Sequence, residues 1–252
     1  MRFFGKEIQV SSLNDLLAKT KKMRMEIYEN KIILIRGLEK LTKEDFIIFC
    51  KKVSGSQNIK ESFIHWNFGP VMELKEESDS KNYLFTKEKV PFHWDGAFHE
   101  VPSILAFHCL EETTGGRTLF ADTTKVIMNL KESEIALLEE HSIEYETEKL
   151  AHYGGHISQK VIAKHPFTLK KILRLGEEVY TEFNPVKRII KSENLKNIVL
   201  KLEVDLYKPS YCYAHEWKKG DLLLVDNYSL LHGREPFTNF EKKRHIRRIQ
   251  IR

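Results

Sequence analysis

YCYAHEWKKGDLLLVDNYSLLHGR, residues 211–234, joins short apolar segments through polar turns. The turn KKGD comes before LLLVDN, which is apolar enough for a buried strand, and HGR at residues 232–234 predicts a second turn. Short strands that follow one another through turns are typical of a β-sandwich or a jelly roll. This stretch therefore predicts a β core.

Similar segments recur on both sides of this stretch. Strands are predicted at residues 31–38, 66–75, 102–110, 115–122, 142–150, 160–167 and 242–252. Helices are predicted at residues 12–29, after a capping box at 42–45, at 122–140 and at 192–207. No repeat, low-complexity segment or linker divides the chain. We predict a single domain, residues 1–252, that is mainly β with flanking helices around a double-stranded β-helix (jelly-roll) core.

The composition is that of a soluble globular protein. Of the 252 residues, 41 are Lys or Arg and 36 are Asp or Glu, which gives a net charge of +5. The longest apolar runs, IILI and LLLV, are far shorter than the roughly 20 residues that span a bilayer. The first ten residues lack the apolar segment of a secretory signal, and the three cysteines (Cys50, Cys109 and Cys212) are scattered. We therefore expect a cytoplasmic protein without disulfides.

The densest basic cluster is KKRHIRRIQIR, residues 242–252. Ile246, Ile249 and Ile251 are interleaved with the charges, which favours a half-buried strand that aims its basic groups at one ligand. A basic arm that binds nucleic acid is the alternative, and it would bind with steep salt dependence and no need for iron. We expect a small-molecule substrate, and neither a nucleic-acid nor a membrane partner.

VPFHWDGAFHE, residues 90–100, contains the one His-x-Asp or His-x-Glu of the sequence. If residues 92–96 are extended, His93 and Asp95 point to the same face and converge on one ion. A mononuclear non-haem iron site needs two imidazoles and one carboxylate, with open positions for co-substrate and oxygen. The best candidate for the third ligand is His232, because it follows a buried strand and precedes Gly233, where backbone can approach closely.

The alternative is a turn that contains two ordinary polar residues, with His232 as a half-buried loop residue. The segment HYGGH, residues 152–156, has the spacing of helical zinc ligands, but its glycines disfavour a helix and it lacks the carboxylate of HExxH. The remaining histidines considered are expected to be structural or on the surface: His65, His99, His108, His152, His156, His165 and His215.

Arg244 and Arg248 of the basic strand can offer guanidinium groups to small molecules bound beside His232, because the planar guanidinium grips a carboxylate through two hydrogen bonds. Thr118, after the Gly115–Gly116 turn, can add a hydroxyl donor. A His-x-Asp pair, a distal histidine and trailing arginines form an ordered set, which chance supplies less readily than any one part.

FHWDGAF, GGRTLFADTTKV, GDLLLVDNYSLLHGR and RHIRRIQI occur in that order and resemble the taurine dioxygenase-like (TauD/TfdA) family of iron(II)/2-oxoglutarate-dependent oxygenases. KIILIRGLEKLTKEDFIIFCKKVSG resembles the opening strand and helix of that family, so the resemblance covers nearly the whole chain. WNFGPVMELK, FHWDGAF and DNYSLLHGR are most like the PvcB type. Enzymes of that type act on isocyanide-bearing amino-acid derivatives made by a companion isocyanide synthase.

The resemblance implies that His93, Asp95 and His232 ligate Fe(II). It further implies that Thr118 and Arg244 hold the distal carboxylate of 2-oxoglutarate, which is converted with O2 to succinate and carbon dioxide. Asp95 disfavours halogenation, because halogenating relatives lack the iron carboxylate.

Arg248 matches the family position that often binds an acidic group of the primary substrate. Its neighbour Arg247 is the rival, since adjacent side chains of a strand point to opposite faces. Arg244 and Arg248 are four residues apart, so a regular strand places both on one face, and this parity favours Arg248.

The implied function is oxygenation of a small amino-acid-derived substrate in secondary-metabolite or siderophore-like biosynthesis. A tyrosine-type isocyanide would undergo PvcB-like decarboxylative desaturation or hydroxylation, and a functional link to an isocyanide synthase is expected. The alternative within enzymes is a hydroxylase of another small acidic molecule, such as a sulfonate, an aryloxy acid or a free amino acid. The oligomeric state is left open.

We expect an active-site lid around residues 60–90 and an insertion around residues 150–210 to line the substrate pocket. Aromatic and histidine side chains in these regions are compatible with an aromatic substrate, although such residues are as often part of a core. The candidates are Trp66, Phe68, Tyr83, His152, Tyr153 and Phe183.

Overall fold

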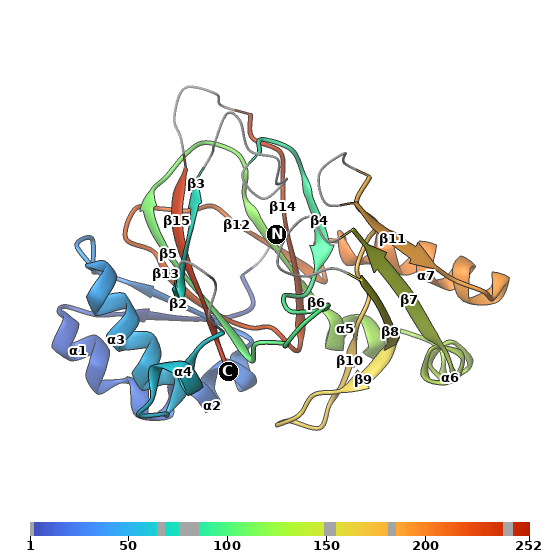
Figure 1. Ribbon diagram of the computed structural model, residues 1–252, viewed down its shortest axis with the longest axis horizontal. Coiled ribbons are helices and arrows are strands. Elements are labelled where there is room, and N and C mark those ends of the chain that lie inside the picture. The colour runs from blue at the N-terminus through green and yellow to red at the C-terminus, as the bar shows by residue number, and fades with distance from the viewer. Residues whose placement is uncertain (1–2, 65–68, 76–85, 149–154, 181–184, 239–243) are drawn as a thin grey trace.

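Two mainly antiparallel sheets face each other in the computed structural model, which describes residues 3–64, 69–75, 86–148, 155–180, 185–238 and 244–252 (Figure 1). The larger sheet contains, in order across it, β1 (Lys6–Gln9), β2 (Ile32–Arg36), β13 (Leu222–Asp226), β5 (Ile104–Glu111), β15 (His245–Ile251) and β3 (Val71–Lys75). The smaller sheet contains β12 (Cys212–His215), β6 (Thr118–Asp122), β14 (Leu230–Arg234) and β4 (Val90–His93). The predicted jelly-roll core is confirmed.

An apolar layer fills the space between the two sheets. Phe107 of β5 and Leu223 of β13 meet Phe120 of β6 and Leu230 of β14 there, and each is 4% exposed or less. Because side chains alternate along a strand, the residues between them face outward, as Ala106 does. Both faces of each sheet are therefore apolar, and helices must cover the outer ones.

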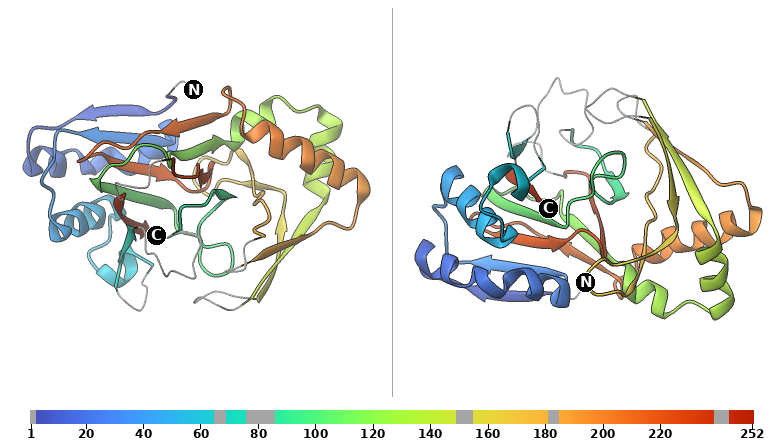
Figure 2. Two further views of the ribbon diagram at one scale, coloured as in Figure 1. Left: turned by 90° about the horizontal axis from the view of Figure 1, so that it is seen from above. Right: turned by 60° about the horizontal axis from the view of Figure 1, so that its bottom comes forward.

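The outer face of the larger sheet is covered by the N-terminal helices (Figures 1 and 2). These are α1 (Leu13–Ala18), α2 (Thr20–Asn30), α3 (Lys43–Ser54) and α4 (Ile59–Ser62). The predicted capping box is confirmed, since Thr42 and Asp45 satisfy each other's backbone N–H groups at the start of α3. The single helix predicted at 12–29 is wrong, because a tight Lys19 N–H to Leu16 carbonyl hydrogen bond separates two helices.

The outer face of the smaller sheet is covered by the segment between β6 and β12 (Figure 2). It contains α5 (Thr123–Met128), α6 (Glu132–Glu140), β7 (Ser142–Thr147), β8 (Gly155–Lys160), β9 (Ile162–Lys164), β10 (Lys171–Leu173), β11 (Val186–Ile189) and α7 (Glu193–Leu206). The predicted helix at 122–140 is two helices, since the backbone tightens at Asn129. The predicted strand at 160–167 is the end of β8, then β9 and a turn.

Glu177 of this segment fixes the position of β4, which is the edge strand of the smaller sheet. Its carboxylate accepts a hydrogen bond from the Phe92 N–H at 2.6 Å, and its own N–H donates to the Phe92 carbonyl at 2.9 Å. Tyr207, after α7, donates its hydroxyl hydrogen to the same carboxylate. The segment between β6 and β12 thus satisfies the outward-facing N–H and carbonyl groups of Phe92 on this edge strand.

The predicted turn at residues 232–234 is wrong, because these residues are the second half of β14. The chain reverses earlier, at residues 227–229. Leu230 and Leu231 point to opposite faces of the smaller sheet, and each belongs to a different apolar cluster. β14 is therefore a central strand, hydrogen-bonded to β6 on one side and β4 on the other. None of the described helices is both long enough and apolar enough to cross a membrane.

Gly233 allows β14 and β4 to approach closely. A Cβ atom at this position would lie 2.7 Å from the Val90 carbonyl oxygen, too near for both to stay in place. We expect Gly233→Ala to lower the free energy of unfolding by about 1–3 kcal/mol, because the strands must separate. Gly176→Ala is the matched control, since its Cβ would meet nothing nearer than Trp94 at 3.4 Å. Urea denaturation measures both, and equal losses would contradict the prediction.

His108 of β5 introduces a pH-sensitive group into the layer under α3. It is 1% exposed, and neither ring nitrogen has a hydrogen-bond partner among the described residues. Burial, reinforced by the charge of Arg247, lowers the pKa of His108 to about 4 from the usual 6.5. The unfolded chain therefore binds a proton that the folded chain rejects, and stability falls as the pH drops through 6.5 toward 4.

We expect the free energy of unfolding of the wild type to fall by about 2 kcal/mol more than that of His108→Leu between about pH 7.5 and pH 5. Urea denaturation of the metal-free proteins at each pH measures this difference, in which the other titrating groups cancel. His156→Asn, at an exposed histidine, should retain the slope of the wild type. Parallel curves for the wild type and His108→Leu would rule out a contribution from His108.

Candidate metal centre

His93 and His232 are direct neighbours across the pairing of β4 with β14. Their ring centroids are 4.2 Å apart, with the ring planes inclined at 49°. His93 Nδ1 lies 2.9 Å from the Pro91 carbonyl, which can only accept a hydrogen bond, so Nδ1 carries the proton. The Nε2 lone pair of His93 is thereby directed away from the strand, as metal binding requires.

Asp95 reaches the two histidines from a turn, so the prediction that residues 92–96 are extended is wrong. β4 ends at His93, and the chain turns at Asp95 and Gly96. Gly96 has a φ of +81°, and a Cβ atom there would lie 2.0 Å from the Glu100 carbonyl oxygen. The turn folds the carboxylate back beside the imidazoles, which strand alternation alone would not do.

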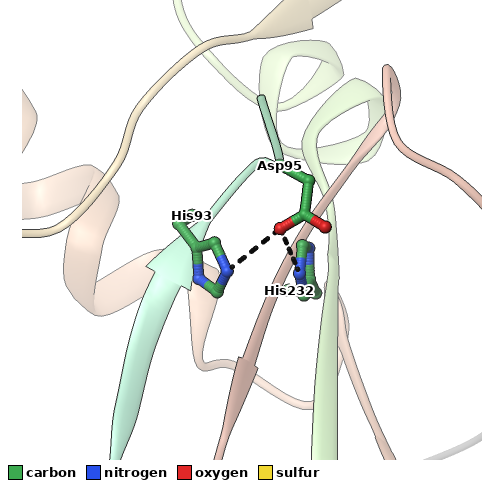
Figure 3. Close-up of side chains that lie close together, drawn as sticks. All are labelled: His93, Asp95 and His232. Carbon is green, nitrogen blue, oxygen red and sulfur yellow. Dashed lines mark ion pairs between the residues drawn. The ribbon is translucent and has the colours of Figure 1, made fainter. Parts of the chain in front are cut away.

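The three side chains converge on one point (Figure 3). Asp95 Oδ1 lies 3.6 Å from His93 Nε2 and 3.5 Å from His232 Nε2. All three candidate ligand atoms lie within 4.8 Å of one another, and this is the one such group among the described residues. Two imidazoles and one carboxylate on one side of an ion are the donor set of mononuclear iron(II) oxygenases. The residues present therefore fit an iron(II) ion.

The protonation states are also those that a metal needs. Burial alone would raise the pKa of Asp95, but the positive charge of Arg248 and the nearby imidazoles of His232 and His93 outweigh it and hold the pKa well below its usual range. Burial, together with repulsion from His93, lowers the pKa of His232 to about 4. At neutral pH the site presents an ionised carboxylate and a neutral His232 imidazole, and no proton must leave either before a cation binds.

The backbone around Asp95 is fastened by Asn227, which follows β13. The Asn227 side-chain oxygen accepts from the Asp95 N–H at 3.1 Å, and its amide nitrogen donates to the Asp95 and Pro102 carbonyls at 3.2 and 2.9 Å. The Asp95 side chain is held by Arg248 and Gln250 of β15, at 2.8 and 2.6 Å from Oδ2. Asn227 and Gln250 were not predicted as site residues, although Asn227 directly follows LLLVD and Gln250 lies between two isoleucines.

A cavity of about 50 Å³ lies beside the candidate ligands. His93, His232, Thr118, Arg244 and Arg248 all line it. Asp95 is not part of the lining, but it lies beside three of these residues, His93, His232 and Arg248. The remaining lining is mostly apolar, with Leu74, Val90, Phe107 and Ile246.

Arg244 is a buried guanidinium without a carboxylate within ion-pair distance in the part of the chain that the structure describes. Its Nη1 makes one long hydrogen bond, 3.4 Å, to the Gly116 carbonyl, and its guanidinium lies 5.2 Å from the Phe237 ring centroid. Burial and the charge of Arg234 lower the pKa of Arg244 to about 9. A carboxylate bound in the cavity would compensate this buried charge.

Thr118 of β6 keeps its hydroxyl hydrogen available. Its Oγ1 accepts a hydrogen bond from Trp217 Nε1 at 2.8 Å, and the hydroxyl can therefore donate to a further acceptor. Thr118 and Arg244 thus offer two donors to an anion in the cavity, as the resemblance implies.

Arg244, which directly precedes β15, and Arg248 within β15 both line the cavity, although the register of β15 shifts between His245 and Ile246. Arg247 does not line the cavity and pairs with Glu73 at 3.2 Å. Arg248 Nη1 lies 2.8 Å from Asp95 Oδ2, and Nη2 lies 3.1 Å from the Met72 sulfur. A role of Arg248 in substrate binding stays a prediction.

Of the other histidines expected to be structural or on the surface, His108 is the buried residue without a hydrogen-bond partner described above. His165 and His215 are buried and lie 3.1 Å from Asp226 and Asp221, respectively, while His99 and His156 are exposed. Several residues predicted to be structural or to line the substrate pocket lie outside the described residues: His65, Trp66, Phe68, Tyr83, His152, Tyr153 and Phe183.

The chain is similar to known proteins in both sequence and fold. The family model of the taurine catabolism dioxygenase TauD, TfdA family matches residues 1–250. The 3-((Z)-2-isocyanoethenyl)-1H-indole synthase of Fischerella ambigua is 37% identical over 234 residues, 89% of this chain and 83% of that protein. The tyrosine isonitrile desaturase of Pseudomonas aeruginosa is 36% identical over 197 residues, 74% of this chain and 67% of that protein.

The fold is similar to that of PvcB from Pseudomonas aeruginosa, with a TM-score of 0.77 and 26% identity over 100% of this chain and 87% of PvcB. A further PvcB structure, described as an Fe, alpha-ketoglutarate dependent oxygenase from an isonitrile synthetic pathway, has a TM-score of 0.69 and 27% identity over 92% and 79% of the two chains. With a family match over almost its whole length, the chain belongs to the TauD/TfdA family and is an iron(II)/2-oxoglutarate-dependent dioxygenase.

Proposed function

We propose that His93, Asp95 and His232 bind the iron(II) of this enzyme, and that Thr118 and Arg244 bind the distal carboxylate of 2-oxoglutarate. The convergence of three ligand atoms within 4.8 Å carries this proposal. The buried charge of Arg244 in the adjoining cavity supports it, because 2-oxoglutarate would supply the missing carboxylate.

The proposed substrate is a small isonitrile derived from an aromatic amino acid, and the proposed outcome is decarboxylative desaturation. The support comes from two relatives, one named as an isocyanoethenyl-indole synthase and the other as a tyrosine isonitrile desaturase. The substrate would come from an isocyanide synthase, which is the functional partner we propose. Within the single domain, the regions around 60–90 and 150–210 are proposed to line its pocket.

The reaction takes place in the cytoplasm under this proposal. The three cysteines are unpaired and buried, which agrees with a reducing compartment: Cys50, Cys109 and Cys212.

When bound, iron(II), 2-oxoglutarate and O2 supply the oxidising chemistry that removes hydrogen from the substrate. The residues of the chain supply geometry and electrostatics. Asp95 and the two histidines would hold the ion beside the cavity. Arg244 and Thr118 would bind the far carboxylate of the co-substrate and so restrict its orientation. The apolar side chains of Leu74 and Phe107 line the same cavity.

Hydroxylation of another small acid, such as a sulfonate, an aryloxy acid or a free amino acid, remains the alternative activity. Succinate release separates the two, because the isonitriles of tyrosine and tryptophan should stimulate it at least tenfold more than these acids. A nucleic-acid-binding function of the C-terminus loses support, since β15 lies inside the larger sheet and Arg244 and Arg248 are buried.

Anaerobic addition of iron(II) and 2-oxoglutarate to the metal-free protein should give a weak visible charge-transfer band. His93→Ala should abolish the band and reduce succinate release at least a hundredfold, because the ion loses one of three protein ligands. His156→Ala removes an exposed histidine elsewhere and is the control. A full band in His93→Ala would exclude this histidine as a ligand.

Arg244→Met should raise the KM for 2-oxoglutarate by tenfold or more, which corresponds to a charged hydrogen bond of about 1.5–3 kcal/mol. The metal affinity measured without 2-oxoglutarate should be almost unchanged, because Arg244 makes no contact with the candidate ligands. Arg247→Met removes an arginine of the same segment from the opposite face and serves as the control. An unchanged KM in Arg244→Met would place the distal carboxylate elsewhere.

A further inference from the structure

The two oxygens of the Asp95 carboxylate have different surroundings. Oδ1 faces the imidazole nitrogens of His93 and His232 at 3.6 and 3.5 Å. Oδ2 faces the larger sheet, where it accepts a hydrogen bond from Gln250 Nε2 at 2.6 Å and an ion pair from Arg248 Nη1 at 2.8 Å. One oxygen is thus committed to the protein and the other to the proposed metal position.

Both donors come from a strand that the fold holds firmly. β15 is hydrogen-bonded to β5 on one side and to β3 on the other. Ile249 and Ile251 anchor it in the apolar layer under the N-terminal helices, which turns Arg248 and Gln250 toward Asp95. Gln250 and Arg248 are 3% and 5% exposed, so water does not compete for Oδ2.

We propose that Gln250 and Arg248 are positioning residues, which hold Asp95 through Oδ2 and reserve Oδ1 alone for the metal. This assignment rests on the proposed iron(II) site. A carboxylate that was free to rotate could bind through both oxygens and occupy a position that the co-substrate or oxygen needs. The resemblance implies a substrate role for Arg248, whereas its guanidinium is here engaged with Asp95.

Gln250 is the better of the two for an experiment. Removal of Arg248 deletes a positive charge beside the proposed metal position. The cation is then repelled less, but a proton competes more strongly for Asp95, so the two effects on metal affinity oppose each other. Gln250 is neutral, and its removal changes only the hydrogen bond to Oδ2. Gln250→Met has a side chain of similar length, and Gln250→Leu has a shorter, branched one. Neither side chain carries a hydrogen-bond donor.

The control is Thr123→Val, which deletes a comparable buried hydrogen bond, from Thr123 Oγ1 to the Ser229 carbonyl at 2.7 Å. Thr123 makes no contact with the candidate ligands. Thr123→Val therefore reports what a merely structural loss does to the protein.

The measurement is the Kd of the full-length, metal-free protein for Mn(II), followed by the loss of the free-ion paramagnetic resonance signal. We expect both Gln250 variants to bind Mn(II) ten- to a hundredfold more weakly than the wild type, since the hydrogen-bond partners of a metal ligand contribute this much. Thr123→Val should keep the Kd of the wild type, although its Tm falls. In the Gln250 variants saturated with iron(II) and 2-oxoglutarate, the charge-transfer band should move to longer wavelength, because Asp95 becomes a stronger donor.

The outcomes separate this inference from the proposed metal site. If the wild type binds Mn(II) and both Gln250 variants bind it within twofold, with an unmoved band, the positioning role is overturned while the metal site stands. If only one variant folds, its Kd and band decide. Failure of the wild type to bind Mn(II) or iron(II) overturns the proposed site and the positioning role together.

Discussion

The buried ion pair between Arg248 and Asp95 joins the two sheets of the core beside the proposed metal position. Arg248 belongs to the larger sheet, whereas Asp95 follows a strand of the smaller one, so the contact fixes the distance between the layers at that point. Breaking a buried pair on one side leaves an uncompensated charge, which is costly. The ion pair thus favours one packing of the sheets and holds Asp95 beside the two histidines, whose own spacing is set by the pairing of β4 with β14.

The site residues that could be predicted are those whose type and spacing in the sequence indicate metal binding. The His-x-Asp spacing and a distal histidine are visible in the sequence because ligand types are few and their spacing is restricted. The turn that places Asp95 beside the histidines could not be predicted, because it depends on the close approach of Gly96 to the Glu100 backbone. Asn227 and Gln250 were missed for the same reason, because their partners lie 132 and 155 residues away.

Helices and strands were predicted correctly where their signals lie within a few neighbouring residues, and less well where distant contacts determine the structure. The capping box at Thr42 and the helix at 192–207 depend on residues that are close in the sequence, and both predictions are confirmed. The helices predicted at 12–29 and 122–140 were each interrupted by one tight backbone turn, which apolar spacing does not record. His-Gly-Arg at residues 232–234 predicts a turn, yet these residues pair with β6 on one side and β4 on the other, which are distant in the sequence.

The attachment of Glu177 to Phe92 has a consequence for how such enzymes diversify and how they can be engineered. The segment between β6 and β12 contains the region proposed to line the substrate pocket, and it also supplies the carboxylate that binds the edge strand beside His93. A transplanted segment that lacked this carboxylate would leave Phe92 open to pairing with another molecule. Chimaeras in which the segment between β6 and β12 is exchanged should therefore be soluble only when the new segment contains Glu177 or an equivalent hydrogen-bond acceptor.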